Sequence, residues 1–145
     1  MEKYYTPEIE DLFVGYECER FRTYCEPDKG CYKDWKSYTW KNTDSIGLSY
    51  SEIELKELRT PYLSSEDIEK EGWKFKGKSI DVWFEKEGIF EMHNFTVYKI
   101  VMHYNLNDHW MFIYAEDRGS EYELFKGIIS SINEFRKICK WLNIK

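Results

Sequence analysis

The stretch FTVYKIVMHYNLNDHWMFIYA, residues 95–115, decides how the rest of this chain folds. Its two flanks, 95–104 and 109–115, are rich in β-branched and aromatic residues and predict two strands. The segment between them, NLND at residues 105–108, consists mostly of Asn and Asp, which tolerate turn geometry. The stretch therefore predicts a β-hairpin. A further strand over residues 121–128, after the turn segment DRGS, extends the hairpin into an antiparallel meander.

The chain before this hairpin shows strand periodicity from residue 79 onwards. Ile80, Val82 and Phe84 face one way, whereas Trp83 lies among polar neighbours that face the other way. An alternation of this kind is typical of a strand with one buried face. We therefore expect Trp83 to point away from the core of this sheet.

Two helices are predicted, and the second has the clearer signals. A short helix near residues 65–71 follows two serines whose side chains can cap it, and it ends at Gly72. A C-terminal helix over residues 131–142 begins with the capping box SINE and carries apolar residues at helical spacing. We expect this helix to cover one face of the sheet. The predicted fold class is α+β, mainly antiparallel, with a curved β-sheet or partial barrel.

The first half of the chain predicts further strands and no boundary between domains. Residues 12–19 and 35–41 alternate in the manner of strands, and residues 53–63 predict a strand whose proline favours an edge position. The segment CEPDKGC, residues 25–31, predicts a turn because Pro, Asp and Gly suit turn geometry. The sequence shows no linker, low-complexity tract or internal repeat, so we predict a single domain over residues 1–145.

Aromatic residues are unusually frequent in this chain, at 9 Phe, 12 Tyr and 6 Trp, or 19% of the sequence. One core of this size holds many such rings, and we expect others at the surface, where Tyr and Trp anchor partners. The formal net charge of −6 is uneven, because residues 1–72 carry 10 Lys or Arg against 17 Asp or Glu. An acidic chain disfavours duplex DNA and anionic membranes as partners, since long-range attraction has the wrong sign.

The cysteines and the apolar runs bear on the compartment. No apolar run is long enough to span a membrane, and the start MEKYYTPEIE lacks the apolar segment of a signal peptide. We therefore expect a cytoplasmic protein in which Cys18, Cys25, Cys31 and Cys139 are reduced. These cysteines form no C-x-x-C pair and have no His near them, so they predict no zinc site.

Candidate catalytic groups are few. Glu17 and Glu19 lie two apart on a predicted strand, which separates them by about 7 Å, a spacing that glycosidases use. The alternative, which we favour, is that they solvate the polar face of that strand. His103 and His109 flank the predicted turn and, with His93, are candidate metal ligands, but no further ligand stands at a recognisable spacing. We predict no catalytic residue, no metal and no cofactor, and we expect that the chain is not an enzyme.

Aromatic and basic residues that share strand faces are the stronger functional signal. Rings stack on bases and cations meet phosphates, as a site for a nucleotide or a single-stranded nucleic acid requires. The alternative for each ring is that it packs inside a core. The predicted ligand-binding residues are Lys36, Tyr38, Trp40, Arg59, Trp83, Lys99 and His103.

Short motifs spread over most of the chain carry a resemblance. They are YTPEI, VGYE, LR, YL, EDIE, GW and LFKGI, at residues 5–9, 14–17, 58–59, 62–63, 66–69, 72–73 and 124–128. With these motifs the chain resembles a loosely defined family of small bacteriophage and prophage proteins of uncharacterised activity. The resemblance supplies no catalytic residues. It implies a phage-encoded accessory protein in the cytoplasm of a bacterial host, of the kind that antagonises host defence.

Three functional hypotheses follow. The first is a phage-encoded, non-enzymatic binding protein, a counter-defence factor that sequesters a small, for example cyclic, nucleotide through aromatic stacking and basic residues. The second is an acidic protein that mimics or captures nucleic acid and so engages a host defence protein. The third is a minor structural protein of the virion. The surplus of aromatic residues also makes a homo-oligomer a reasonable expectation.

Overall fold

The computed structural model describes residues 3–41, 51–92 and 95–145, and it is an α+β fold with two antiparallel sheets, as predicted. Contacts divide the chain into two compact units, Met1–Tyr62 and Leu63–Lys145, which we call the N-terminal unit and the C-terminal unit. The single domain predicted for the whole chain stays a prediction, because a division of contacts does not decide whether either unit folds without the other.

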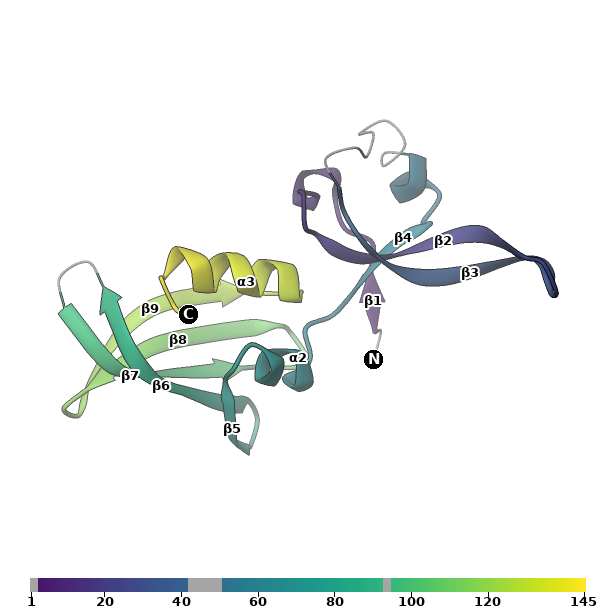
Figure 1. Ribbon diagram of the computed structural model, residues 1–145. Helices are drawn as coiled ribbons and strands as arrows, with labels where there is room; N and C mark the ends of the chain where they lie inside the picture. The colour runs from purple at the N-terminus through teal and green to yellow at the C-terminus, as the bar shows by residue number, and fades with distance from the viewer. Residues whose placement is uncertain (1–2, 42–50, 93–94) are drawn as a thin grey trace. The chain divides into compact units, whose positions relative to one another are not determined.

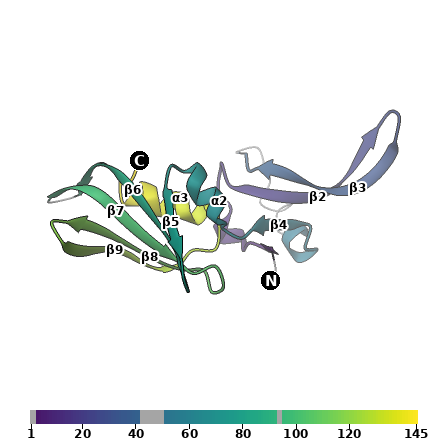
Figure 2. The ribbon, with the colours of Figure 1, turned by 90° about the horizontal axis from the view of Figure 1, so that it is seen from below.

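The C-terminal unit contains a five-stranded antiparallel sheet in which strands pair in the order β5-β6-β7-β8-β9. The last three strands are the predicted meander, whereas β5 was not predicted. Figures 1 and 2 show α3 lying along one face of this curved sheet. In the part of the chain that the structure describes, the sheet does not close into a barrel, since β5 and β9 form its edges. The elements are α2 (Ser65–Lys70), β5 (Lys74–Lys78), β6 (Val82–Met92), β7 (Phe95–Tyr104), β8 (Trp110–Asp117), β9 (Ser120–Ile128) and α3 (Ile132–Trp141).

The predicted hairpin joins β7 to β8, and its turn is held by the Asn and Asp side chains. The Asn105 side-chain oxygen accepts the backbone N–H of Asn107 at 2.9 Å, and the Asp108 carboxylate accepts that of Trp110 at 3.1 Å. His109 has a positive φ of 60°, and its N–H donates to the Asn105 carbonyl at 2.9 Å. The turn therefore sets the register in which β7 and β8 pair.

One prediction for β6 is wrong at its start. Val82 and Phe84 are buried, as expected, but Ile80 is 84% exposed. Ile80 lies in a turn before β6, where the Ser79 N–H donates to the Asp81 carbonyl at 2.9 Å. The apolar alternation in the sequence begins at Ile80, two residues before β6. Alternation alone does not distinguish an apolar residue in a turn from one in a strand.

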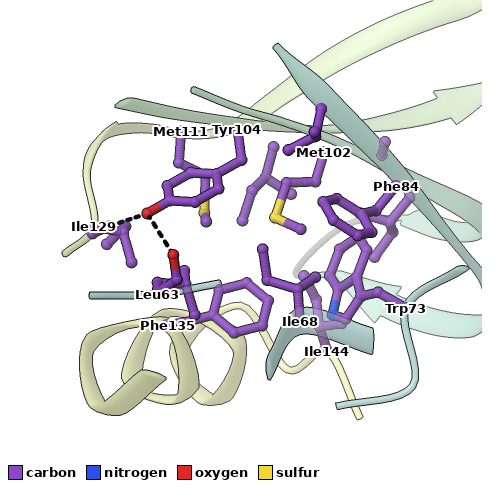
Figure 3. Packing of buried hydrophobic residues seen from close by; sticks show 14 of the residues in the cluster. Leu63, Ile68, Trp73, Phe84, Met102, Tyr104, Met111, Ile129, Phe135 and Ile144 are labelled. Carbon is purple, nitrogen blue, oxygen red and sulfur yellow. Dashed lines mark hydrogen bonds between the residues drawn. The ribbon is translucent and has the colours of Figure 1, made fainter. Parts of the chain in front are cut away.

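The core of the C-terminal unit lies between α3, α2 and one face of the sheet (Figure 3). Ser131 caps α3 as predicted, since its hydroxyl accepts the Glu134 N–H at 3.3 Å. Burying a side chain of the size of Leu or Phe stabilises the fold by about 1.5 to 3 kcal/mol, so this face contributes most of the stability of the unit. The buried members include Leu63, Ile68, Trp73, Val82, Phe84, Ile100, Met102, Tyr104, Met111, Ile113, Ile129, Phe135 and Ile144.

Tyr104 places a polar group inside this core and satisfies it. Its hydroxyl lies 3.2 Å from the Ile129 carbonyl and 3.4 Å from the Leu63 carbonyl, and it is 3.0 Å from Nδ1 of His109 (Figure 3 draws the first two bonds). Burial raises the pKa of Tyr104 far above its ordinary value and lowers the pKa of His109, so both groups are neutral at pH 7. The hydroxyl thus ties three separate segments of the chain together.

Tyr104→Phe tests this network. We expect the free energy of unfolding to fall by about 1 to 3 kcal/mol, because the substitution leaves buried carbonyl groups without a donor. The control is Tyr98→Phe, since the Tyr98 side chain is 64% exposed. Urea unfolding followed by circular dichroism measures both variants, and equal stability of the two would contradict the role given to the Tyr104 hydroxyl.

The N-terminal unit contains a four-stranded sheet in the order β1-β4-β2-β3. The strand expected from residue 12 begins only at Glu17, because Gly15 has a φ of 94° and Val14 is 63% exposed. The strand expected over 53–63 is also shorter, since it follows a helical turn. Tyr16, Cys18, Trp40 and Leu58 form the core of this unit. Its elements are β1 (Tyr4–Tyr5), η1 (Ile9–Asp11), β2 (Glu17–Glu26), β3 (Gly30–Thr39) and β4 (Leu58–Pro61).

A disulfide corrects the expectation that all four cysteines are reduced. Cys25 of β2 and Cys31 of β3 lie directly opposite each other across the predicted turn, and their sulfur atoms are bonded. The expectation rested on the compartment, whereas the pairing follows from the register of the hairpin, which brings the two Cα atoms within 4.0 Å. Cys18 and Cys139 are free thiols, as predicted.

Thiol labelling tests the disulfide. In denaturant without reductant, iodoacetamide should modify two cysteines, and after reduction it should modify all four, as read by intact mass. The double variant Cys25→Ser/Cys31→Ser should lose about 2 kcal/mol of stability, the chain-entropy value for a short loop. The control, Cys18→Ser/Cys139→Ser, should take up no label before reduction. Four labels on the unreduced wild-type chain would show that the bond does not form.

Candidate functional site

The face of the five-stranded sheet opposite α3 carries a row of aromatic side chains. Successive residues of a strand point to opposite faces, so the residues between the core positions point outward. Trp83, His103 and Phe112 lie directly opposite one another on β6, β7 and β8, and Lys126 of β9 continues the row. The outward rings, which we call the aromatic face, are Trp83, His103, Trp110, Phe112 and Tyr114.

These rings form one continuous series of near-parallel neighbours. Ring centroids are 6.3 Å apart for Trp83 and His103, and 5.9 Å apart for His103 and Tyr114. The series continues at 5.3 Å from Tyr114 to Phe112 and at 6.2 Å from Phe112 to Trp110. The four interplanar angles lie between 21° and 29°. All five rings are half-buried. Because neighbouring rings are near-parallel, a flat ligand placed parallel to one of them is close to parallel to the next.

Gly77 of β5 provides the space for the first ring of the series. Gly77 pairs with Trp83, and a Cβ atom at position 77 would lie 2.5 Å from the indole carbon Cζ2. No side chain larger than hydrogen therefore fits beneath this ring without moving it. The position of Trp83 depends on a residue of the neighbouring strand as well as on its own strand.

Ion pairs neutralise the sheet surface beside the rings. The Lys99 ammonium lies 2.9 Å from Glu116 and 3.3 Å from Glu85, and Lys76 lies 2.9 Å from Glu85. The hydrogen bond from Lys76 lowers the pKa of Glu85, and the one to Glu116 raises the pKa of Lys99, so these groups keep their charges at neutral pH. Lys99 is on the predicted face, but its charge is already compensated by carboxylates.

Lys126 supplies a cation at the other end of the series. Its ammonium lies 5.6 Å from the centroid of the Trp110 ring, a cation–π distance. Among the residues that the structure describes, no carboxylate forms an ion pair with Lys126. The site thus combines near-parallel rings with one cation, Lys126, that has no ion pair with a carboxylate of the described ranges.

The structure brings together three of the seven predicted site residues. Trp83, Lys99 and His103 share the outer face of the C-terminal sheet. The sequence predicted a common face for Lys99 and His103 and an outward direction for Trp83, without placing the three together. Sequence reasoning missed Phe112 and Lys126 because nothing in the sequence gives the register of β8 and β9. Alternation along residues 109–115, with aromatic residues at every second position, was the signal that could have found the rings of β8.

Tyr38 and Trp40 belong to the N-terminal unit and contribute to its packing. Trp40 is only 7% exposed, so it lies in the core and offers no face to a ligand. The guanidinium carbon of Arg20 lies 3.9 Å from the centroid of the Tyr38 ring and 4.8 Å from that of Trp40. Trp40 thus packs inside a core, which was the alternative to ligand binding. The cation over both rings is Arg20 of the same unit, and not a group that awaits a ligand.

The two predicted cations of the N-terminal unit also have partners there. The Lys36 ammonium lies 4.0 Å from the centroid of the Tyr24 ring. The Arg59 guanidinium binds the Glu19 carboxylate at 2.7 Å and lies 4.1 Å from the centroid of the Trp35 ring. A phosphate here would have to displace these contacts, so we do not place the site in this unit.

The carboxylates considered for catalysis have a simpler role. Glu17 is exposed on β2, and Glu19 forms the ion pair with Arg59 that joins β2 to β4. The Glu19 carboxylate therefore has a structural contact between two strands. The arrangement supports the interpretation of these acids as the polar face of a strand.

The two described histidines, His103 and His109, lie on opposite sides of the sheet. His103 stacks between Trp83 and Tyr114 on the outer face, whereas His109 contacts the Tyr104 hydroxyl on the core side. His93 lies outside the described residues. Within the described ranges, no three His, Cys, Asp or Glu side chains are arranged to hold a metal ion.

Comparisons of the chain with protein-family models, with curated proteins and with solved structures find no match. The resemblance to small phage proteins therefore stays a prediction. Among the residues that the structure describes, no helix has the length and apolar character needed to cross a bilayer.

A double-mutant cycle between Gly77 and Trp83 tests the origin of the ring series. Gly77→Ala should lower the free energy of unfolding by about 1 to 3 kcal/mol, because the new methyl group collides with the indole. In a Trp83→Ala background the same substitution should cost nothing, since the obstacle is gone. Chemical denaturation of the four proteins gives the coupling energy, and a cost of Gly77→Ala that is the same in both backgrounds would refute the contact.

Proposed function

We propose that this chain is a non-enzymatic binding protein that holds a small nucleotide on the aromatic face, with its base stacked on the rings and a phosphate near Lys126. The observation that carries the proposal is the continuous series of five near-parallel, half-buried rings. Such a surface leaves apolar area in contact with water, and a flat ligand would cover it. Stacking of a base on an aromatic side chain is worth about 1 to 3 kcal/mol.

The distribution of charge favours a small nucleotide over a long nucleic acid. Beside the rings, the sheet carries Glu85 and Glu116, and β9 adds Glu121 and Glu123 opposite β8. A polynucleotide laid across the sheet would bring successive phosphates close to these carboxylates, which repel it. A single base with one phosphate group at the Lys126 end avoids that repulsion. The net charge of −6 acts in the same direction.

The biological role that we propose follows the resemblance to phage accessory proteins: sequestration of a nucleotide signal in the cytoplasm of a bacterial host. The Cys25–Cys31 disulfide is typical of oxidising compartments. It therefore argues against the cytoplasmic location and not against nucleotide binding. The binding chemistry of the aromatic face does not depend on the compartment, because neither cysteine belongs to the C-terminal unit.

The acidic alternative, in which the first half of the chain mimics nucleic acid, has less support. Several of its acids are engaged within the N-terminal unit: Glu19 binds Arg59, and Glu26 binds Lys29 at 2.9 Å. Glu52 is buried and binds Arg20 at 3.1 Å. Acids in such pairs present less negative potential than the sequence count suggests. The structural role in a virion stays a prediction as well.

Calorimetric titration with AMP, GMP, CMP, UMP and cyclic dinucleotides tests the proposed function. At least one of them should bind, and Trp110→Leu should weaken that binding about tenfold, the loss expected for one stacked base. Lys126→Gln should weaken it too and should reduce its dependence on salt.

The matched controls lie on α3. Trp141 is 74% exposed and lies outside the aromatic face, so Trp141→Leu should bind like the wild type. Lys137→Gln removes a cation from the same helix and should also leave the affinity unchanged. Flat titrations across the whole panel, or equal effects of Trp110→Leu and Trp141→Leu, would refute the proposed site.

A further inference from the structure

A cavity of the C-terminal unit lies beside α3, on the side of the sheet away from the aromatic face. It measures about 320 Å³, a size suited to a small organic molecule. Its floor is apolar and its rim carries cations from β6 and α3. We call it the basic pocket, and its principal lining residues are Trp73, Phe135 and Ile144 on the floor and Lys86, Arg136 and Lys140 on the rim.

The floor consists of core side chains whose outer edges reach the cavity. Trp73 is 2% exposed and Ile144 is 6% exposed, and the Trp73 and Phe135 rings have centroids 6.0 Å apart (Figure 3). Ile144 reaches this place because the chain reverses after α3: Asn143 has a φ of 57°, and the Ile144 N–H donates to the Cys139 carbonyl at 2.8 Å. This is the Schellman pattern of a helix end, which returns an apolar residue to the helix it has just left.

The floor also contains a polar atom that the protein itself does not satisfy. The indole N–H of Trp73 is buried and has no hydrogen-bond acceptor of normal geometry among the described residues. The Cys139 sulfur interacts with it, but a thiol is a weak acceptor. Leaving a buried donor unsatisfied is costly, and this nitrogen lies beneath the surface of the pocket lining, where a change at the pocket would alter its surroundings.

The rim is positive. The Lys86 ammonium donates to the Glu71 carbonyl at 2.8 Å, and Arg136 binds the Glu71 carboxylate at 2.8 Å. Lys140 is exposed near the end of α3. The lining carries the cationic side chains of Lys86, Arg136, Lys140 and Lys145 with the carboxylate of Glu71, so cationic side chains outnumber acidic ones at this pocket of an otherwise acidic protein. A dianion matches that excess better than a monoanion does.

We propose that the basic pocket binds a small phosphate monoester, with its apolar group against the floor and its phosphate at the rim. This site is separate from the aromatic face and does not rest on the function proposed there. The thiol that lines the pocket is a weak nucleophile, because burial raises the pKa of Cys139 to about 12. The phosphate oxygens meet the cations of the rim, and the apolar group lies against the floor beside Trp73.

The experiment titrates the full chain with phenyl phosphate, benzoate and inorganic phosphate, and follows the Trp73 indole N–H signal by ¹⁵N NMR. Trp73→Phe assigns that signal. Phenyl phosphate should shift the signal in a saturable manner and should bind at least tenfold more tightly than benzoate, which has one charge, or inorganic phosphate, which has no apolar group. A Trp73 signal that does not move, or equal affinity for the three probes, overturns the proposal.

Matched variants distinguish binding in this pocket from non-specific attraction to surface cations and from binding on the aromatic face. Lys140→Glu should weaken phenyl phosphate binding at least tenfold, whereas Lys137→Glu, the same charge change on the same helix outside the pocket, should alter it less than twofold. Trp110→Leu should leave it unchanged. Equal effects of the two lysine variants would show non-specific attraction, and loss of binding in Trp110→Leu would place the ligand on the aromatic face instead; either result refutes the pocket.

Discussion

Side chains alternate between the two faces of β7, and this alternation determines what each face of the sheet carries. The face beneath α3 carries Ile100, Met102 and Tyr104. The same alternation turns Lys99 and His103 to the opposite face, and the pairing of β6, β7 and β8 repeats it across the sheet. The apolar side must be buried to stabilise the unit, so the core favours the register that the turn between β7 and β8 sets. The row of rings on the other side is a consequence of that register.

The two candidate sites of the C-terminal unit therefore have different physical origins. The aromatic face arises from side chains that the sheet cannot bury, since α3 and α2 pack on its other side. The basic pocket arises at the border of the core, where the helix end and the chain reversal at Asn143 leave a cavity beside Trp73. One site offers parallel rings with a single cation, and the other offers several cations over a small apolar floor.

The N-terminal unit shows why aromatic and basic residues on one strand are an ambiguous signal. Lys36, Tyr38 and Arg59 each have a contact within that unit: Lys36 over a tyrosine ring, Tyr38 beneath Arg20, and Arg59 between rings and Glu19. A cation over a ring stabilises a fold as readily as it binds a ligand. The pattern that suggests a ligand site is thus also the pattern of a small unit that packs its own charged side chains.

The sequence by itself determined the local structure wherever the signal was local. The turn at 105–108, the cap at Ser131, the short helix over α2 and the meander of strands follow from propensities and spacings of a few residues. Tertiary structure alone decided the pairing of Cys25 with Cys31, the burial of Trp40, and the alignment of Phe112 and Lys126 with Trp83. These depend on contacts between segments far apart in the chain or on strand register, which no local pattern contains.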